Sequence, residues 1–403
     1  MSGDDERSES LDSVSDEVAN GDDAGPNDED GRGRARIAID RAADRMLDAS
    51  VLERLAIAVA STTLALLIGL VLVAVTGYDP LLFVSNVIEG AFGDANAIAR
   101  TLRFTTMFVL TGVAVAIAFR AGVFNIGVQG QFVVGGLTTV MTILWLAPVL
   151  PRGAVGGVAL VVLGTAAAAI TGGLYGALPG VLKAYGDANE IITTIMLNFI
   201  AVGVVGFLVE GPFRGEGNRA PNTERLPEYV EFPRIVFDSS GFSVVGLAIA
   251  LVVVIVVTLV MARTRFGYDM ITSGHQQDAA TFAGVDARKT IVTTMTFSGA
   301  VAGIAGAVFA IMIQGYYSDP SGVATYGFDA IAVSLLAANN PLGVVPAGLL
   351  FGGLDSAGTH IGIYSDVPVQ LIDGILGLVV LFVAAPELFR MAAKRIGLGG
   401  EDR

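Results

Sequence analysis

The chain has 403 residues, of which 53% are hydrophobic and 15% are charged, and its mean hydropathy is +0.68. Soluble domains carry roughly 25% charged residues, so this composition excludes an ordinary soluble globular protein. There is no cysteine, which excludes disulfides and thiol chemistry. The two histidines, His275 and His360, are far apart in the sequence and form no metal-ligand pattern.

The acidic balance, a net charge of −14, comes mostly from the N-terminal segment. Residues 1–32 are dense in Asp and Glu and nearly free of large apolar side chains. Such a segment buries too little surface to fold, so we expect residues 1–50 to be an acidic, disordered cytoplasmic tail. It has no basic n-region and no early apolar core, unlike a signal peptide. A solvated extension without a function is the favoured interpretation, although the acidity would also suit a halophilic prokaryote.

Long apolar runs predict a polytopic bundle of transmembrane helices. A run of about 18 or more apolar residues, rising about 1.5 Å each, matches the roughly 30 Å hydrocarbon core. We therefore predict an all-α fold with about ten spans inside a transmembrane domain of residues 51–390, followed by a cytoplasmic tail, 391–403. The long spans are expected near 54–76, 104–119, 124–147, 154–180, 189–209, 242–262, 290–313, 342–358 and 368–386.

The remaining element, residues 327–340, is too short to cross. It offers only about ten apolar positions before Pro341, or about half a bilayer of helix. Backbone that ends at membrane depth is tolerated against protein or a water-filled cavity. We therefore expect a short, buried helix here, of a kind that can build a solute path, or else a proline kink without such a role.

Basic residues predict the orientation. Six arginines between Arg32 and Arg54 precede the first span, and positive charge holds that end in the cytoplasm. Ten crossings then leave both termini inside. The polar segment 211–240 becomes an extracytoplasmic loop, with Arg100 and Arg103 on that same side, and 267–289 becomes a cytoplasmic segment.

Neither a nucleotide site nor a dense proton relay can be found in the sequence. There is no G-x-x-x-x-G-K-[ST] motif and no Gly-Lys pair. Ionisable groups at membrane depth are few: Glu190 and Asp329, which fit helix N-termini, and Asp355 and Asp373, which an ion-coupled carrier would need. We expect the energy for any transport to come from a partner, and an intramembrane enzyme is disfavoured.

Two further stretches carry polar groups in unusual places. In AFRAGVFNIGVQGQFVVGG, residues 118–136, amide side chains stand where a span begins, and they either contact a solute or satisfy backbone groups freed by the glycines. In the segment 263–310, a small apolar patch follows a polar run. A short helix of that kind either docks into a groove of a soluble partner or lies on the membrane surface.

These stretches resemble one family. FNIGVQGQ, DANEIITTIMLNFIA (187–201), the segment from Gly267 to Gly306, and GFDAIAVSLLAANNPLG are similar to motifs of the permease subunits of ATP-binding-cassette importers. The group includes branched-chain amino acid, ribose and nucleoside systems, and the nucleoside or simple-sugar branch is the nearest. The likeness covers about residues 55–390. Gln129 departs from the usual Glu, and SGHQQDAATFAG departs from the usual start of the coupling loop.

The resemblance implies a transport subunit, not an enzyme, in a prokaryotic plasma membrane. It implies a second permease (identical or different), two ATP-binding subunits that use ATP and Mg²⁺, and an extracytoplasmic solute-binding lipoprotein, without nucleic acid. This chain itself would bind no cofactor. Nucleosides rank first as the solute, then simple sugars and branched-chain amino acids. The translocation path would involve Asn125, Gln129, Gln131, Asn189, Glu190, Asn198 and Asp329, and coupling to the ATPase would involve Gly274, Asp278, Ala279, Ala280, Ala283 and Gly284.

Overall fold

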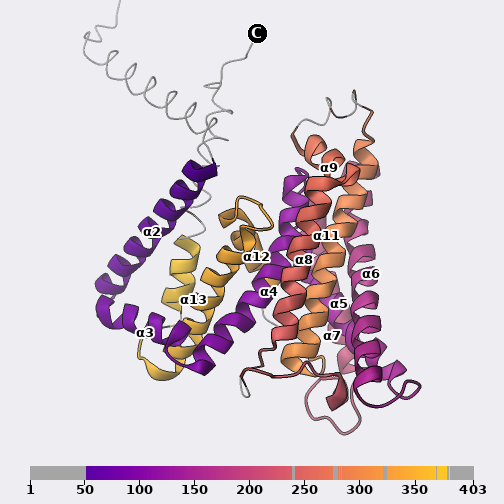
Figure 1. Ribbon diagram of the computed structural model, residues 1–403, viewed down its shortest axis with the longest axis horizontal. Coiled ribbons are helices and arrows are strands. Elements are labelled where there is room, and N and C mark those ends of the chain that lie inside the picture. The colour runs from indigo at the N-terminus through magenta and orange to yellow at the C-terminus, as the bar shows by residue number, and fades with distance from the viewer. Residues whose placement is uncertain are drawn as a thin grey trace, which may run out of the picture. The chain divides into compact units, whose positions relative to one another are not determined.

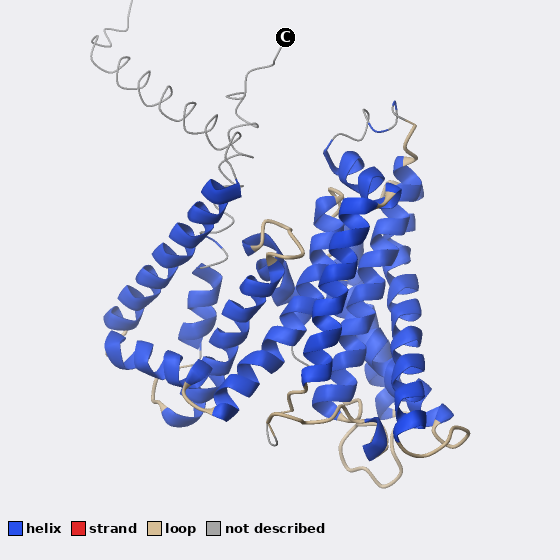
Figure 2. Ribbon diagram, viewed as in Figure 1, coloured by secondary structure: helices blue, strands red, loops and turns tan. Residues whose placement is uncertain are grey.

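The computed structural model describes residues 51–237, 241–275, 280, 282, 284–320, 325–368, 370–378 and 381. They belong almost entirely to one compact unit, Leu55–Glu387, and the predicted tails lie outside them. Within these ranges every regular element is helical and no strand is formed, although one isolated bridge joins Asn222 and Ser318 (Figure 2). The predicted all-α class is confirmed.

Among the residues that the structure describes, six helices are long and apolar enough to cross a membrane. Each coincides with a span predicted near the same residues. The described elements also include four further helices, the short η1 (Glu228–Val230), α9 (Arg265–His275) and a helical segment at 370–378. The total of about ten crossings stays a prediction. The six are α4 (Ala95–Arg120), α5 (Val128–Leu146), α6 (Ala154–Gly186), α7 (Glu190–Glu210), α8 (Val244–Arg263) and α11 (Ala287–Phe309), which continues as the π-helix η2 (Ala310–Gln314) (Figure 1). The others are α2 (Val51–Val75), α3 (Pro80–Phe92), α12 (Tyr326–Leu336) and α13 (Val344–Tyr364).

The N-terminal third differs from the prediction. α3 was not predicted, and α4 begins at Ala95 and not near residue 104, so that Arg100 and Arg103 lie within a helix. Asp79 and Asp94 explain both starts, because each caps the backbone N–H groups of a first turn. A search for apolar runs stops at the two arginines, whereas a helix needs only a cap and the absence of a breaker.

The tightest packing joins α5, α6 and α11 through glycines. A Cβ atom on Gly172 of α6 would lie 2.5 Å from the carbonyl oxygen of Gly299 in α11, and one on Gly135 of α5 would lie 2.6 Å from the Cα of Gly303. Helices in lipid gain little from apolar side chains that are already in an apolar solvent, so close backbone contact stabilises them instead. We call this trio the glycine core.

A second set of helices surrounds a separate cluster of buried side chains. α2, α3, α13 and the segment 370–378 contribute Val73, Phe83, Leu354, Ile361 and Ile372, among others. We call this set the outer helices. α4 contacts both sets, because Thr105 packs against Gly352 of α13 while Val115 belongs to the main core.

The chain turns sharply at two points that matter below. After α12, Ala338 and Asn339 adopt positive φ angles of 49° and 56°, and the Ser334 hydroxyl lies 2.9 Å from the Asn339 side-chain oxygen. The short helix is therefore confirmed, but it ends at Leu336 and not at the predicted residue 340. After η2, the backbone N–H of Leu226 donates to the carbonyl of Gly315, which ties the predicted loop to the end of α11.

Candidate functional site

The amides of FNIGVQGQ meet in a buried network at the start of α5. The side-chain amide of Asn125 donates to the side-chain oxygens of Gln131, at 3.0 Å, and of Ser298 in α11, at 2.8 Å. Ser298 in turn donates to the carbonyl of Ala114 in α4 at 2.6 Å. The Asn125 side-chain oxygen accepts from the backbone N–H of Gly127 at 3.1 Å. Asn125 and Ser298 together thus join α4, α5 and α11 by polar contacts.

Two more amides extend this network to other helices. Asn198 of α7 accepts from the backbone N–H of Gly130 at 2.8 Å and donates to the carbonyl of Ile126 at 2.9 Å. Gln129 accepts from the backbone N–H of Gly327, at the start of α12, at 2.8 Å. We name Asn125, Gln129, Gln131, Asn198 and Ser298 the amide hub; each is at most 4% exposed.

The amide hub satisfies backbone groups, which was one of the two open interpretations. A buried polar group without a partner costs about 1–3 kcal/mol, and here the amides serve N–H groups that the start of α5 leaves without helical partners. A neutral Gln129 suits this place, since a buried carboxylate would require a compensating charge. Contact with a solute stays a prediction, and in this conformation it requires the hub to open.

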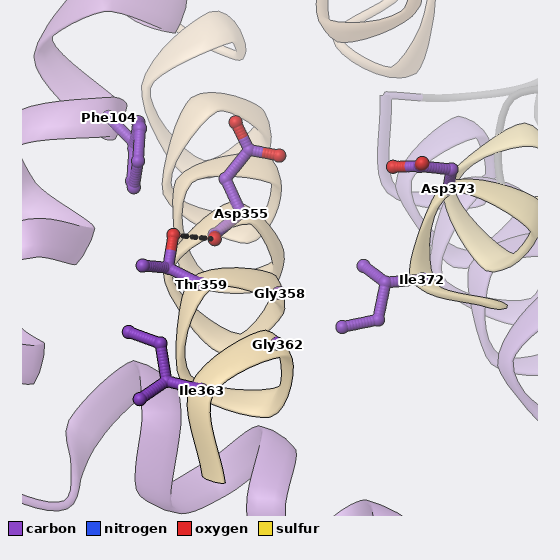
Figure 3. A pocket seen from close by; sticks show the side chains of 8 residues that line it. All are labelled: Phe104, Asp355, Gly358, Thr359, Gly362, Ile363, Ile372 and Asp373. Carbon is purple, nitrogen blue, oxygen red and sulfur yellow. Dashed lines mark hydrogen bonds between the residues drawn. The ribbon is translucent and has the colours of Figure 1, made fainter. Parts of the chain in front are cut away.

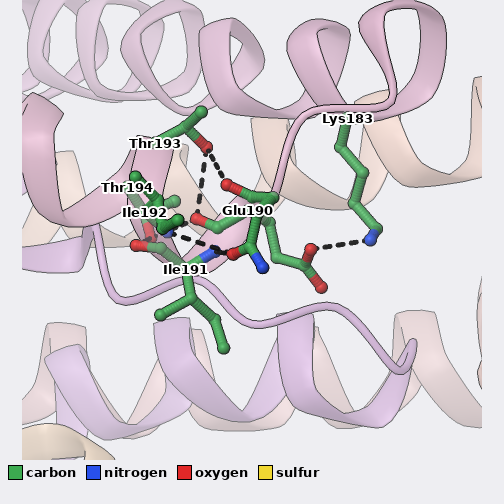
Figure 4. A network of polar contacts seen from close by, with 7 residues as sticks. Lys183, Glu190, Ile191, Ile192, Thr193 and Thr194 are labelled. Atoms are coloured by element: carbon green, nitrogen blue, oxygen red, sulfur yellow. Dashed lines mark hydrogen bonds and ion pairs between the residues drawn. The ribbon is translucent and has the colours of Figure 1, made fainter.

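The other predicted path residues lie outside the hub. Asn189 caps α7 by accepting from the backbone N–H groups of Ile191 and Ile192. Glu190 forms an ion pair of 2.7 Å with Lys183 of α6, beside the Thr193 and Thr194 hydroxyls that bond back to their own helix (Figure 4). Asn189 thus begins α7, and Glu190 joins α7 to α6.

Asp329 also lies outside the hub. It is exposed in the first turn of α12, where its carboxylate accepts from the Thr325 hydroxyl at 3.1 Å. An acid at this position is favoured by the partial positive charge of a helix N-terminus. Tyr326 and Gly327, which precede Asp329 in the first turn of α12, are buried. The start of the short helix is therefore buried on one side and carries an exposed carboxylate on another.

The predicted coupling segment contacts the turn that leads to the hub. Helix α9 (Arg265–His275) carries Gly274, and a Cβ there would lie 2.5 Å from the carbonyl oxygen of Arg120 and 2.8 Å from the backbone nitrogen of Gly122. Gly122 itself has a φ of 67°, which favours glycine. Close backbone contact therefore places α9 directly against the α4–α5 turn.

The rest of the coupling segment is described only in part. Ala280 is buried, Phe282 is 95% exposed, and Gly284 has a φ of 83°. The other predicted coupling residues, Asp278, Ala279 and Ala283, lie outside the described residues.

A pocket of about 420 Å³ lies between α4, α13 and the segment 370–378. Two carboxylates line it, Asp355 and Asp373, which are the two membrane-depth acids that the sequence had left for an ion-coupled carrier. In Figure 3, Asp355, Thr359 and Ile363 follow one another along α13, and Asp373 lies across from them. The whole lining consists of Phe104, Asp355, Gly358, Thr359, Gly362, Ile363, Ile372 and Asp373.

Sequence reasoning missed the remaining members of this lining. The signal was present, because Asp355, Thr359 and Ile363 are four residues apart and so share one helix face. Phe104 gave no signal, since its helix was expected to begin at that residue. No group of three or more His, Cys, Asp or Glu side chains suited to a metal occurs in the part of the chain that the structure describes.

The described helices and their apolar length are those of a multi-pass membrane protein. The chain belongs to the family described as the branched-chain amino acid transport system / permease component, whose model matches residues 97–384. No solved structure matches the chain.

Three curated relatives are named as permeases of ABC transporters. The chain is 32% identical over 364 residues to the guanosine ABC transporter permease protein NupP of Bacillus subtilis, a match that covers 87% of this chain and 99% of NupP. It is 28% identical to the nucleoside permease NupB of Lactococcus lactis, over 79% of this chain and 87% of NupB. It is 30% identical to the glucose permease TsgB13 of Haloferax volcanii, over 84% of this chain and 89% of TsgB13.

Some of these organisms supply a second, more distant match. The guanosine permease NupQ of Bacillus subtilis is 25% identical over 66% of this chain and 84% of NupQ. The nucleoside permease NupC of Lactococcus lactis is 27% identical over 63% of this chain and 79% of NupC. Two permeases of one named specificity therefore occur together among the relatives.

Proposed function

We propose that this chain is the translocation subunit of an ATP-driven importer for nucleosides in a prokaryotic plasma membrane. The observation that carries the proposal is its 32% identity to a guanosine permease along 99% of that protein. The relatives named for nucleosides and for glucose both transport sugar-bearing or sugar solutes by name. Nucleosides accordingly rank first, simple sugars second and branched-chain amino acids third.

The chain works with partners in this proposal. Two ATP-binding subunits hydrolyse ATP with Mg²⁺, a second permease completes the path, and a solute-binding lipoprotein delivers the solute from outside. The pairs of permeases in single organisms support a second, different permease. Copurification of the full chain in mild detergent tests this set: an ATP-binding protein and a lipoprotein are expected, and recovery of the chain alone would count against it.

Movement of the segment 267–289 is proposed to switch the path between outward- and inward-facing states. The contact between Gly274 and the α4–α5 turn supports this, because a displaced α9 would move the turn that begins the amide hub. Gly274→Val should separate α9 from the α4–α5 turn and reduce transport at least tenfold, while the protein stays folded. Gly186→Val, at a glycine with nothing within 4 Å of the added Cβ, is the matched control.

The orientation is tested by thiol labelling, since the chain has no cysteine of its own. With both termini in the cytoplasm, 267–289 is inside and 211–240 is outside. In intact cells, a membrane-impermeant maleimide should label Glu216→Cys in the loop and spare Phe282→Cys. The reverse pattern would overturn both the orientation and the coupling proposal.

Uptake of labelled guanosine, glucose and leucine by cells with and without the chain tests the solute class. Guanosine uptake should depend on the chain and should disappear on ATP depletion but persist with a protonophore while ATP is maintained. An ion-coupled secondary transporter is the alternative, favoured by the two aspartates of the pocket. That alternative predicts the opposite response, in which the protonophore or removal of Na⁺ abolishes uptake.

A further inference from the structure

The pocket between α4, α13 and the segment 370–378 has the build of a site for a small, neutral, hydroxylated molecule. Its volume of about 420 Å³ lies within the roughly 300–1,000 Å³ of small-molecule sites, which combine apolar walls with a few placed polar groups. Here the apolar walls are Phe104, Ile363 and Ile372, and the polar groups are two carboxylates and a threonine hydroxyl.

The polar groups select for donors. Carboxyl oxygens accept hydrogen bonds, and each group has room for more than one donor. The Thr359 hydroxyl donates to the backbone carbonyl of Asp355 within α13, at 3.1 Å. Its oxygen therefore stays able to accept a hydrogen bond. The lining therefore offers acceptors on two sides, a match for vicinal hydroxyl groups of a sugar ring.

The apolar groups supply a flat face. Phe104 lines the pocket, and the guanidinium of Arg103 lies over its ring, 4.8 Å from the centroid. That cation–π contact fixes the ring's orientation. Nucleobases and sugar rings both stack on such aromatic faces, with about 1–3 kcal/mol per stacked base in other proteins.

We propose that this pocket is a sugar-binding subsite on the translocation path, in which Asp355 and Asp373 accept from vicinal hydroxyl groups and Phe104 stacks on the ring. The inference rests on the proposed function, since it names the part of the solute that the path recognises. It adds Phe104, Asp355, Thr359 and Asp373 to the path, none of which belongs to the amide hub. α4 carries both features, with Phe104 and Ala114 on one helix, about 15 Å apart.

Saturation-transfer NMR on the full chain in lipid nanodiscs tests the subsite without the binding protein. The probe is guanosine, with 2′,3′-dideoxyguanosine as the analogue that lacks the diol. The wild type should transfer saturation to the ribose protons of guanosine and bind the dideoxy analogue about tenfold more weakly or worse, because the carboxylates would lose their partners. Asp355→Asn and Asp373→Asn should weaken guanosine about tenfold and reduce its advantage over the analogue.

The matched control is Asp366→Asn, which removes an exposed charge just after α13 without touching the lining. Each variant is first checked for a monodisperse elution profile, and Asp355→Glu provides a second variant that keeps the acceptor. Guanosine binding that is unchanged in Asp355→Asn and Asp373→Asn, or lost equally in Asp366→Asn, would overturn the subsite.

Failure of the two proposals can be told apart. If guanosine uptake in cells depends on the chain but the pocket variants bind and transport normally, only the subsite is wrong. If uptake does not depend on the chain, the proposed function is wrong and the subsite with it. If added Na⁺ competes with guanosine and abolishes the ribose signal, the pocket is a cation site. This result would also overturn the subsite.

Discussion

The glycine core and the outer helices both consist of packed helices, but they differ in whether the packing leaves free volume. In the core, α5, α6 and α11 approach so closely that Gly172 and Gly299 leave no room for a side chain, and every polar group of the amide hub finds a partner. Among the outer helices, α13 and the segment 370–378 leave a pocket with two carboxylates on its wall. Close backbone packing leaves no free volume in the core, whereas the outer helices leave a pocket.

The difference follows from the residues available to each region. Small residues permit backbone contact but supply no side chain to reach across a gap, so the helices that carry them must touch. The outer helices bury larger side chains such as Phe83 and Leu354 and leave a pocket beside α13. They too make one close backbone contact, since a Cβ on Gly90 of α3 would lie 2.8 Å from the Cα of Ala357 in α13. A transporter needs both a closely packed part that stays rigid and a part that contains free volume.

The largest effect is expected from filling the glycine core. Gly303→Val would drive a side chain into the backbone carbonyl of Ala168 and toward Gly172, so we expect a loss of more than about 3 kcal/mol or no folded protein. Gly203→Val in α7, where an added Cβ meets nothing within 4 Å, should be tolerated. Thermal stability in detergent, followed by elution profile, measures both, and equal losses would show that the close contact is unimportant.

A smaller loss is expected from breaking the amide hub. Ser298→Ala removes the acceptor of the Asn125 amide and the donor to the Ala114 carbonyl, which should cost about 1–3 kcal/mol because the partners stay buried. Thr258→Val in α8 is the control, since that hydroxyl bonds only to Val254 of its own helix. Unfolding of purified protein in mixed micelles reports both values, and a Ser298→Ala variant as stable as the control would contradict the structural role of the hub.

The ion pair between α6 and α7 should contribute less. Lys183 and Glu190 are 29% and 12% exposed at the side chain, so their coupling should be on the order of 1 kcal/mol, near the upper end for pairs that water reaches. A double-mutant cycle with Lys183→Met and Glu190→Gln measures it. Uptake that falls in Glu190→Gln and recovers in the double variant would show that Glu190 has a structural role. Uptake that stays low in the double variant would instead indicate that Glu190 belongs to the translocation path.

The smallest effect has the opposite sign. Gly374 lies in the helical segment 370–378, and a Cβ added there would meet nothing within 4 Å. Because glycine in a helix costs about 0.5–1 kcal/mol relative to alanine, Gly374→Ala should raise stability by roughly 0.5 kcal/mol. A decrease in the midpoint of thermal unfolding would mean that this glycine, like those of the core, makes a close contact.

Much of the fold could be predicted from the sequence, and the reasons for the misses are physical. Long apolar runs located α5, α6, α7 and α8 within a few residues, because length and hydropathy together match a bilayer. The start of α4 was missed because two arginines interrupt its hydropathy. Its N-cap at Asp94 outweighs that interruption.

The candidate sites were predictable only in part. Periodicity and motif singled out Asn125, Gln131 and Asn198, and the structure brings them together. Which atoms they serve depends on helices far away in the sequence, such as α11 with Ser298, and no local pattern carries that information. Asp355 and Asp373 were noticed as charges in apolar surroundings, yet their shared pocket depends on how α13 packs beside the segment 370–378.

The fastening of the loop to η2 has a mechanical consequence. The helix that begins after Asp286 and runs through Gln314 is continuous over 28 residues, a rod on the order of 40 Å long. One end is clamped to the loop by backbone bonds from Leu226 to Gly315 and from Thr223 to Tyr317, and the other end adjoins the segment that carries Phe282. The loop and the segment that carries Phe282 thus adjoin the two ends of one continuous helix, so a displacement of either would act on the same element.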